Sequence, residues 1–180
     1  MDGDKNIILV GLMGAGKTTI GKRIAHALRM EFVDSDQEIE QRTGADIPWI
    51  FDIEGEDGFR RRERDVIAEI CQRSGIVLAT GGGAVLDEAN RETLRNCGTV
   101  VYLCASVDQI YRRISRSTHR PLLRCENPRR RLRELLETRD PLYREVAHHV
   151  IVTDQHSVQH MVRQILRQIR PTGGKSRVAS

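Results

Sequence analysis

Five short apolar runs along the chain predict buried β-strands. All but the second are nearly continuous Val, Ile and Leu, which is typical of strands covered on both faces of a parallel sheet. The five runs are Asn6–Val10, Glu31–Val33, Ile76–Ala79, Thr99–Leu103 and His149–Val152.

Helix-like patterns fill most of the chain between these runs. The clearest is an apolar stripe of 3.6-residue period from Val158 to Ile169. Strands that alternate with helices predict an α/β fold with a parallel sheet and right-handed crossovers. The predicted helices are Lys17–Arg29, Phe59–Cys71, Asn90–Asn96, Val107–Arg116, Pro128–Thr138 and Ser157–Ile169.

Two segments break this alternation. One is the long stretch Ser35–Ser74, and the other is the Arg-rich piece Ser115–Asn127. Long loops in compact domains usually bind ligands or close over them. We therefore predict a single domain over residues 1–170, with a substrate-binding segment at about 35–74, a lid at about 115–127 and a disordered tail at 171–180.

Composition excludes several classes of protein. The 180 residues carry a net charge of +4, and no apolar run approaches the ~20 residues that a membrane helix needs. The opening residues MDGDKN contain two Asp and lack the apolar centre of a secretory signal. We expect a cytoplasmic monomer with no membrane contact.

The four cysteines give no sign of a metal site. They are Cys71, Cys97, Cys104 and Cys125, with no CxxC pair and no His at ligand spacing. In a cytoplasmic protein we expect four reduced thiols.

Arginine dominates the basic residues, since only four of the 29 are lysines. Eleven arginines fall between Arg112 and Arg144. They fit a solvated helix face or the binding of a small anion, because guanidinium donors bind both oxygens of a carboxylate or phosphate. Nucleic-acid binding is disfavoured, because aromatic residues make up only 4% of the chain.

A phosphate-binding loop is the strongest signal in the sequence. Gly11–Thr18 matches G-x-x-x-x-G-K-[ST] between a predicted strand and a predicted helix. Its amides can surround phosphate oxygens, Lys17 supplies a positive charge, and Thr18 offers a hydroxyl to Mg²⁺. An Asn-Lys-x-Asp guanine-binding motif is lacking and the chain is short for a motor or helicase, which favours a small kinase that uses a nucleoside triphosphate.

Two carboxylates follow the second predicted strand, at the edge where ligands bind in such sheets. In an extended chain, Asp34 and Asp36 project to the same side, so that one can hold the metal's water shell and the other the acceptor hydroxyl. The alternative is a helix N-cap at Ser35 or Asp36. A further acid, Asp154, follows the fifth run, which we expect at the sheet edge and away from the loop.

Three consecutive glycines, Gly81, Gly82 and Gly83, follow the third predicted strand. Such a run is costly to order, so it favours a place where a ligand approaches the backbone. A tight turn without a ligand is the alternative.

With these residues in view, the chain resembles bacterial shikimate kinases over roughly residues 6–170. The resemblance rests on an ordered set of motifs rather than on the phosphate loop alone. The motifs are Gly11–Thr18, Asp34-Ser35-Asp36, Gly55-Glu56-x-x-Phe59-Arg60-x-x-Glu63, Gly81-Gly82-Gly83, Arg120-Pro121-Leu122-Leu123 and Arg139-Asp140-Pro141-Leu142-Tyr143.

The resemblance implies a P-loop fold with strand order 2-3-1-4-5. It also implies transfer of a phosphoryl group from ATP to the 3-hydroxyl of shikimate, with Mg²⁺, in the pathway to the aromatic amino acids. The roles it implies are Lys17, Asp36 and Arg120 in catalysis; Gly14, Ala15, Gly16, Lys17, Thr18, Thr19, Arg113 and Arg120 at ATP; Asp36, Arg60, Gly81, Gly82, Gly83 and Arg139 at shikimate; and Thr18 and Asp34 at the metal.

Within these motifs, Asp36 would orient the acceptor hydroxyl, and Arg60 and Arg139 would clamp the carboxylate. Glu63 lies one helical turn from Arg60 and can fix its rotamer. His156 stands where the family often has Gln or Arg. The rival interpretations are a gluconate or nucleotide kinase of the same fold, and a nucleotide-binding regulatory module without chemistry.

Overall fold

The computed structural model describes residues 5–116, 126–154 and 156–169. In these ranges a five-stranded parallel sheet has the order β2-β3-β1-β4-β5, so the predicted fold class and strand order are confirmed. The strands are β1 (Asn6–Val10), β2 (Glu31–Asp34), β3 (Ile76–Ala79), β4 (Gly98–Cys104) and β5 (His149–Val152).

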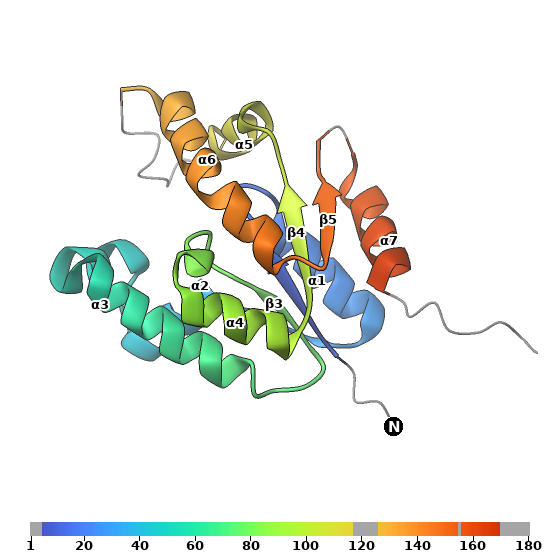
Figure 1. The fold of residues 1–180 in the computed structure, drawn as a ribbon, viewed down its shortest axis with the longest axis horizontal. Coiled ribbons are helices and arrows are strands. Elements are labelled where there is room, and N and C mark those ends of the chain that lie inside the picture. Colours follow the sequence, from blue (N-terminus) through green and yellow to red (C-terminus); the bar gives the residue numbers. More distant parts are fainter. Residues whose placement is uncertain (1–4, 117–125, 155, 170–180) are drawn as a thin grey trace, which may run out of the picture.

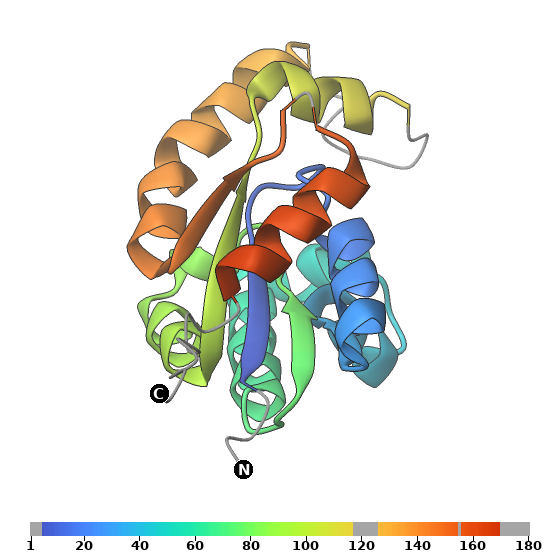
Figure 2. The same cartoon turned by 90° about the vertical axis from the view of Figure 1, so that its right-hand side faces the viewer.

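Helices cover both faces of the sheet (Figures 1 and 2). α1 and α7 pack together on one side, while α4 packs against β4 and lies between α3 and α6 on the other. The helices are α1 (Lys17–Leu28), α2 (Ser35–Thr43), α3 (Ile47–Ile70), α4 (Glu88–Cys97), α5 (Val107–Ile114), α6 (Pro128–Val146) and α7 (Val158–Ile169), with a short 3₁₀ turn η1 (Ala84–Leu86).

The apolar runs form the core, as their composition predicts. Every residue of β1 and β3 is buried, which explains why neither strand alternates apolar and polar residues. The apolar stripe of α7 supplies buried Met161, Val162 and Ile165. Of the described helices, none is long and apolar enough to cross a membrane.

The stretch 35–74, in which we predicted a helix only over Phe59–Cys71, is mostly helical. α2 and α3 occupy it, and Gly55 interrupts α3 with φ 71° and ψ 179°. The prediction of an extended Asp34–Asp36 segment is therefore wrong. The Asp34 side chain accepts hydrogen bonds from the amides of Asp36 and Gln37, which makes Asp34 the N-cap and places Asp36 in the first turn of α2.

α6 is longer than predicted and continues through Pro141 to Val146. A proline inside a helix removes one backbone hydrogen bond, but Tyr143 and Val146 bury their side chains in the core and hold the last turns in place. The predicted lid at about 115–127 lies largely outside the described residues, and the predicted tail at 171–180 lies wholly outside them.

Candidate active site

The phosphate-binding loop connects β1 to α1 at the carboxyl edge of the sheet. Gly14 and Gly16 have φ of 77° and 102°, a conformation that side chains disfavour, and Gly16 is the N-cap of α1. The Lys17 ammonium donates to the carbonyl oxygens of Gly11, at 2.7 Å, and Leu12, at 3.1 Å. The loop thus presents the start of a helix and a buried cation to one cavity.

That cavity is a cleft of about 760 Å³, a size typical of small-ligand sites. It is lined by residues of the loop, of both strand ends beside it and of the start of α7. The lining residues are Met13, Gly14, Ala15, Gly16, Lys17, Thr18, Thr19, Ile20, Asp34, Asp36, Thr80, Gly82, Arg113, Ile114, His156, Ser157, Val158 and Met161. Every described residue that we predicted at ATP is among them.

The Arg113 guanidinium lies against the phosphate-binding loop. It donates to the carbonyl oxygens of Gly14 and Ala15 at 3.2 and 3.1 Å, and to the hydroxyl and carbonyl oxygens of Thr153. It therefore ties the loop to the end of β5. Its expected contact with ATP stays a prediction.

Thr18 and Asp34 form an oxygen pair beside Lys17. The Thr18 hydroxyl donates to Asp34 Oδ2 at 3.0 Å, while Asp34 Oδ1 is held by the first amides of α2. A hydroxyl and a carboxylate are hard oxygen donors of the kind that suits Mg²⁺, which takes few protein ligands and keeps several waters. The pair fits such an ion better than it fits zinc, and the described residues contain no cluster of three or more His, Cys, Asp or Glu able to hold a metal.

The Asp36 carboxylate lies at the boundary between the nucleotide cleft and the glycine run. Its Oδ1 is buried without a hydrogen-bond partner among the described residues. Burial and the neighbouring carboxylates of Asp34 and Glu63 together raise the pKa of Asp36 to about 6, against the opposing effect of Lys17. A carboxylate with this pKa is ionised at neutral pH and basic enough to accept a proton from a hydroxyl.

The glycine run after β3 is required by close side-chain packing. A Cβ on Gly81 would lie 2.6 Å from Asp36 Oδ1 and 3.0 Å from Glu63 Oε1, and a Cβ on Gly83 would overlap the Arg60 guanidinium. None of the three glycines has a positive φ. Their small size lets two carboxylates and a guanidinium reach the backbone of this loop.

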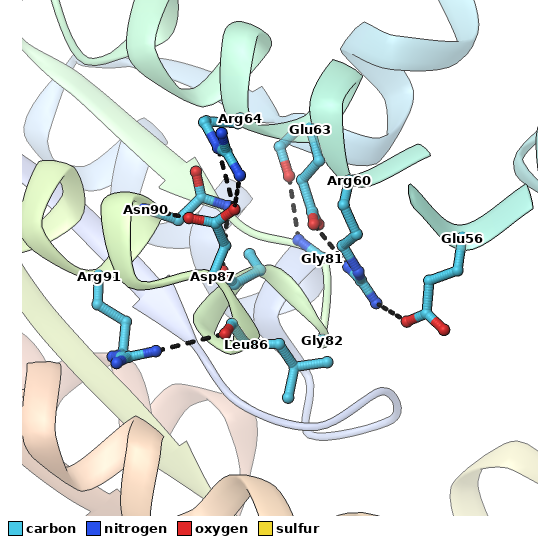
Figure 3. Close-up of polar contacts among 12 residues, drawn as sticks. Glu56, Arg60, Glu63, Arg64, Gly81, Gly82, Leu86, Asp87, Asn90 and Arg91 are labelled. Carbon is cyan, nitrogen blue, oxygen red and sulfur yellow. Dashed lines mark hydrogen bonds and ion pairs between the residues drawn. The ribbon is translucent and has the colours of Figure 1, made fainter. Parts of the chain in front are cut away.

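Arg60 projects from α3 toward this loop (Figure 3). Its guanidinium pairs with Glu63 at 2.6 Å and with Glu56 at 3.3 Å. The Glu63 side chain is only 1% exposed, and burial raises its pKa while Arg60 and Arg139 lower it. The predicted one-turn contact between Arg60 and Glu63 is present, and it leaves the Arg60 side chain 18% exposed.

Arg139 reaches the same place from α6. Its Nη1 lies 3.7 Å from where a Cβ of Gly82 would stand, and it is close enough to Tyr143 and Glu63 to influence the pKa of each. The Tyr143 hydroxyl donates to the Gly82 carbonyl oxygen. Two guanidinium groups from different helices thus converge on one glycine-rich loop beside Asp36.

The far end of this loop is braced by polar contacts (Figure 3). Asp87 is the N-cap of α4 and also pairs with Arg64 of α3. Asn90 donates to the Ala84 carbonyl oxygen at 3.1 Å, and Arg91 donates to that of Val85 at 2.9 Å. η1 is therefore fixed to both α3 and α4, which keeps the glycine run in place.

The predicted site residues within the described ranges are thus brought together, while Arg120 lies outside those ranges. Asp154, which we expected away from the loop, lies after the edge strand β5. It accepts from the Ser106 amide at 3.1 Å and does not line the cleft.

Sequence reasoning missed two groups that shape the site. The Ser35 hydroxyl accepts from the Gly81 amide at 3.0 Å and joins α2 to the glycine run. Val158 and Met161 of α7 line the nucleotide cleft. The position of Ser35 within the Asp-Ser-Asp motif could have identified it as a site residue. Val158 and Met161 belong to the apolar stripe of α7, so the sequence does not distinguish them from core residues.

Comparison with known proteins agrees with this geometry. The family model described as shikimate kinase matches residues 13–170. A shikimate kinase from Pseudomonas entomophila is 58% identical over 92% of this chain and 96% of its own length. One from Thioalkalivibrio sulfidiphilus is 57% identical over 92% of this chain and 87% of its own length.

Solved structures give the same result. A shikimate kinase from Acinetobacter baumannii in complex with shikimate superposes with a TM-score of 0.88 and 54% identity, covering 92% of this chain and 93% of that one. A gluconokinase from Sinorhizobium meliloti, at 22% identity and a TM-score of 0.61, shares the fold alone. The motifs, the paired guanidinium groups and these relatives together show that the chain belongs to the shikimate kinase family, the enzymes that phosphorylate shikimate with ATP.

Proposed function

We propose that this chain transfers the γ-phosphoryl group of ATP to the 3-hydroxyl of shikimate, with Asp36 as the group that orients and deprotonates the hydroxyl. The observation that carries this proposal is the position of Asp36. Its carboxylate lines the nucleotide cleft and also lies against Gly81, next to Glu63 and the glycine run that Arg60 and Arg139 approach. Both substrates can therefore meet at one carboxylate.

On the nucleotide side, the amides of the loop Gly11–Thr18 bind the phosphates. Lys17 neutralises charge at the transferred group, which is the larger part of catalysis in phosphoryl transfer. Thr18 and Asp34 would hold Mg²⁺, Asp34 through water, and a bound ion would shield the phosphate charge.

On the acceptor side, Arg60 and Arg139 bind the carboxylate of shikimate. Guanidinium groups suit this task because each presents two parallel donors to a carboxylate. Gly82 offers its backbone amide to the substrate, and Gly81 and Gly83 leave room for the side chains around it. Glu63 positions Arg60 and does not touch the substrate.

Proton transfer is the step in which Asp36 takes part directly. With a pKa near 6, its carboxylate is mostly ionised at neutral pH, so it aligns the 3-hydroxyl and accepts its proton as the phosphoryl group arrives. Arg120, in the predicted lid, would close over ATP and exclude water; it lies outside the described residues and stays a prediction.

The test is a coupled ADP-release assay with the wild-type protein and three acceptors: shikimate, gluconate and a nucleoside monophosphate. We expect turnover with shikimate alone, dependent on Mg²⁺, and an Asp36→Asn variant that still binds ATP but has lost turnover. Preferred turnover of gluconate or of a nucleotide would refute the substrate assignment.

Two further expectations belong to the same proposal. The protein is a monomer, which sedimentation would test, and it does not use its arginines to bind nucleic acid. Filter binding to RNA across a salt series tests the second expectation, because specific binding would persist at physiological salt.

A further inference from the structure

Two of the cysteines that the sequence presents as unrelated thiols are neighbours in the fold. Cys71 caps the end of α3 and Cys97 ends α4; these two helices pack against each other, and each thiol is close enough to influence the pKa of the other. Both are free thiols on residues that are only partly buried. Cys104, the other described cysteine, is on β4 beside Arg144 and is not part of this pair.

The pair is held in place by Asn6, the first residue of β1. Its side-chain amide donates to Cys97 Sγ at 3.3 Å and to the Arg73 carbonyl oxygen at 2.7 Å, and its Oδ1 accepts from the Ile76 amide at 3.1 Å. Asn6 is 4% exposed, so these contacts form in the interior. One residue therefore fixes Cys97 and the turn after Cys71 together.

The hydrogen bond from Asn6 favours a reactive thiolate at Cys97 over a metal ligand. Asn6 approaches Cys97 with an N–H donor, which stabilises a thiolate and would repel a cation. The neighbouring Cys71 thiol and the Asn6 amide both lower the pKa of Cys97, against the effect of burial. A stabilised thiolate beside a second thiol is the arrangement of a redox-active pair.

We propose that Cys71 and Cys97 form a reversible modification site, which a hydroperoxide converts to an intramolecular disulfide. The Cys97 thiolate attacks the peroxide oxygen, which gives a sulfenic acid and, after protonation of the leaving group, water. Cys71 then attacks the sulfenic sulfur, the new S–S bond forms, and a second water leaves. Two thiols and one hydrogen peroxide thus give one disulfide and two waters, and a dithiol reverses the change.

The site lies at the end of the sheet opposite the reaction. Cys97 immediately precedes β4, whose carboxyl end is about 20 Å away at the rise of a strand. The disulfide joins the ends of α3 and α4 and closes a loop of about 26 residues. Its expected effect is on stability, because a cross-link reduces the conformational freedom of the unfolded chain.

The experiment treats the reduced, full-length protein with hydrogen peroxide and maps its peptides by mass spectrometry. We expect a Cys71–Cys97 peptide about 2 Da lighter than its two reduced halves, lost again on adding dithiothreitol. The oxidised protein should unfold several degrees higher than the reduced one. The matched control Cys104→Ala should form the same peptide, whereas Cys71→Ala should not form it.

A second measurement does not depend on the peptide map. In Cys71→Ala the sulfenic acid on Cys97 has no thiol to react with, so dimedone should label Cys97 there and leave Cys97 of the oxidised wild type unlabelled. Cross-links to Cys104 or Cys125, disulfides between chains, or a Cys71 that stays reduced while Cys97 is oxidised would each overturn the proposal.

Discussion

Replacing Asp36 by Asn should stabilise the fold while it destroys activity. Burial raises the pKa of Asp36 from 3.8 to about 6, so the folded protein holds an ionised carboxylate at a cost of about 3 kcal/mol at pH 8. Asn is the same size and carries no charge. The variant should therefore resist urea better than the wild type, with turnover lowered about 100-fold or more.

The pH dependence of this stability difference shows whether it comes from the buried charge of Asp36. Below pH 3.8 the carboxyl group is neutral in both folded and unfolded chains, so the cost exists only above that pH and grows until the pH passes the folded pKa near 6. The advantage of Asn should shrink from about 3 kcal/mol at pH 8 to about 1 kcal/mol near pH 4.5.

Urea unfolding at these two pH values measures the advantage directly. Glu92→Gln, which removes an exposed carboxylate from α4, is the control and should change stability little. A variant less stable than the wild type at pH 8, or an advantage that does not depend on pH, would refute the reasoning about burial.

Four other outcomes follow from the same site. Lys17→Ala should lose most of kcat in the ADP-release assay, because it removes the charge beside the phosphates. Arg139→Ala should raise KM for shikimate roughly tenfold or more while KM for ATP changes little, and equal effects on both would contradict the carboxylate clamp. Gly83→Ala should also raise KM for shikimate, because its Cβ would displace Arg60; kinetics with varied shikimate would show it. Wild-type kcat/KM should fall about tenfold per pH unit below pH 6 as Asp36 is protonated, and a flat profile between pH 5 and 7 would contradict its role.

The sheet could be predicted from sequence because its strands are buried on both faces. Continuous runs such as Asn6–Val10 and Ile76–Ala79 have few other places in a soluble domain. The phosphate-binding loop was equally clear, since its glycines and Lys17 stand at a fixed spacing. These signals are local, and each is contained in a few consecutive residues.

One feature that escaped prediction is local. Asp34, and not Ser35 or Asp36, caps α2, so the chain turns into a helix where an extended segment was expected. Two other features depend on partners that are distant in sequence. α6 continues through Pro141 because Tyr143 is buried in the core, and Cys71 meets Cys97 only because α3 and α4 pack together. No local pattern contains these two tertiary contacts.

The two oxygens of Asp34 have a consequence for how substitutions at this position are interpreted. Asp34 Oδ2 accepts a hydrogen bond from the Thr18 hydroxyl, and Asp34 Oδ1 accepts one from the Asp36 amide in the first turn of α2. The Asp34 carboxylate thus connects the start of α1, which follows the phosphate-binding loop, to the start of α2, which carries Asp36. Removing the Asp34 carboxylate would destabilise the start of α2 by about 1 kcal/mol and leave the position of Asp36 less well fixed. If Asp34 and Asp36 have the proposed roles, lost turnover in an Asp34→Ala protein would combine misalignment of Asp36 with loss of a magnesium ligand, and added magnesium would restore only the second.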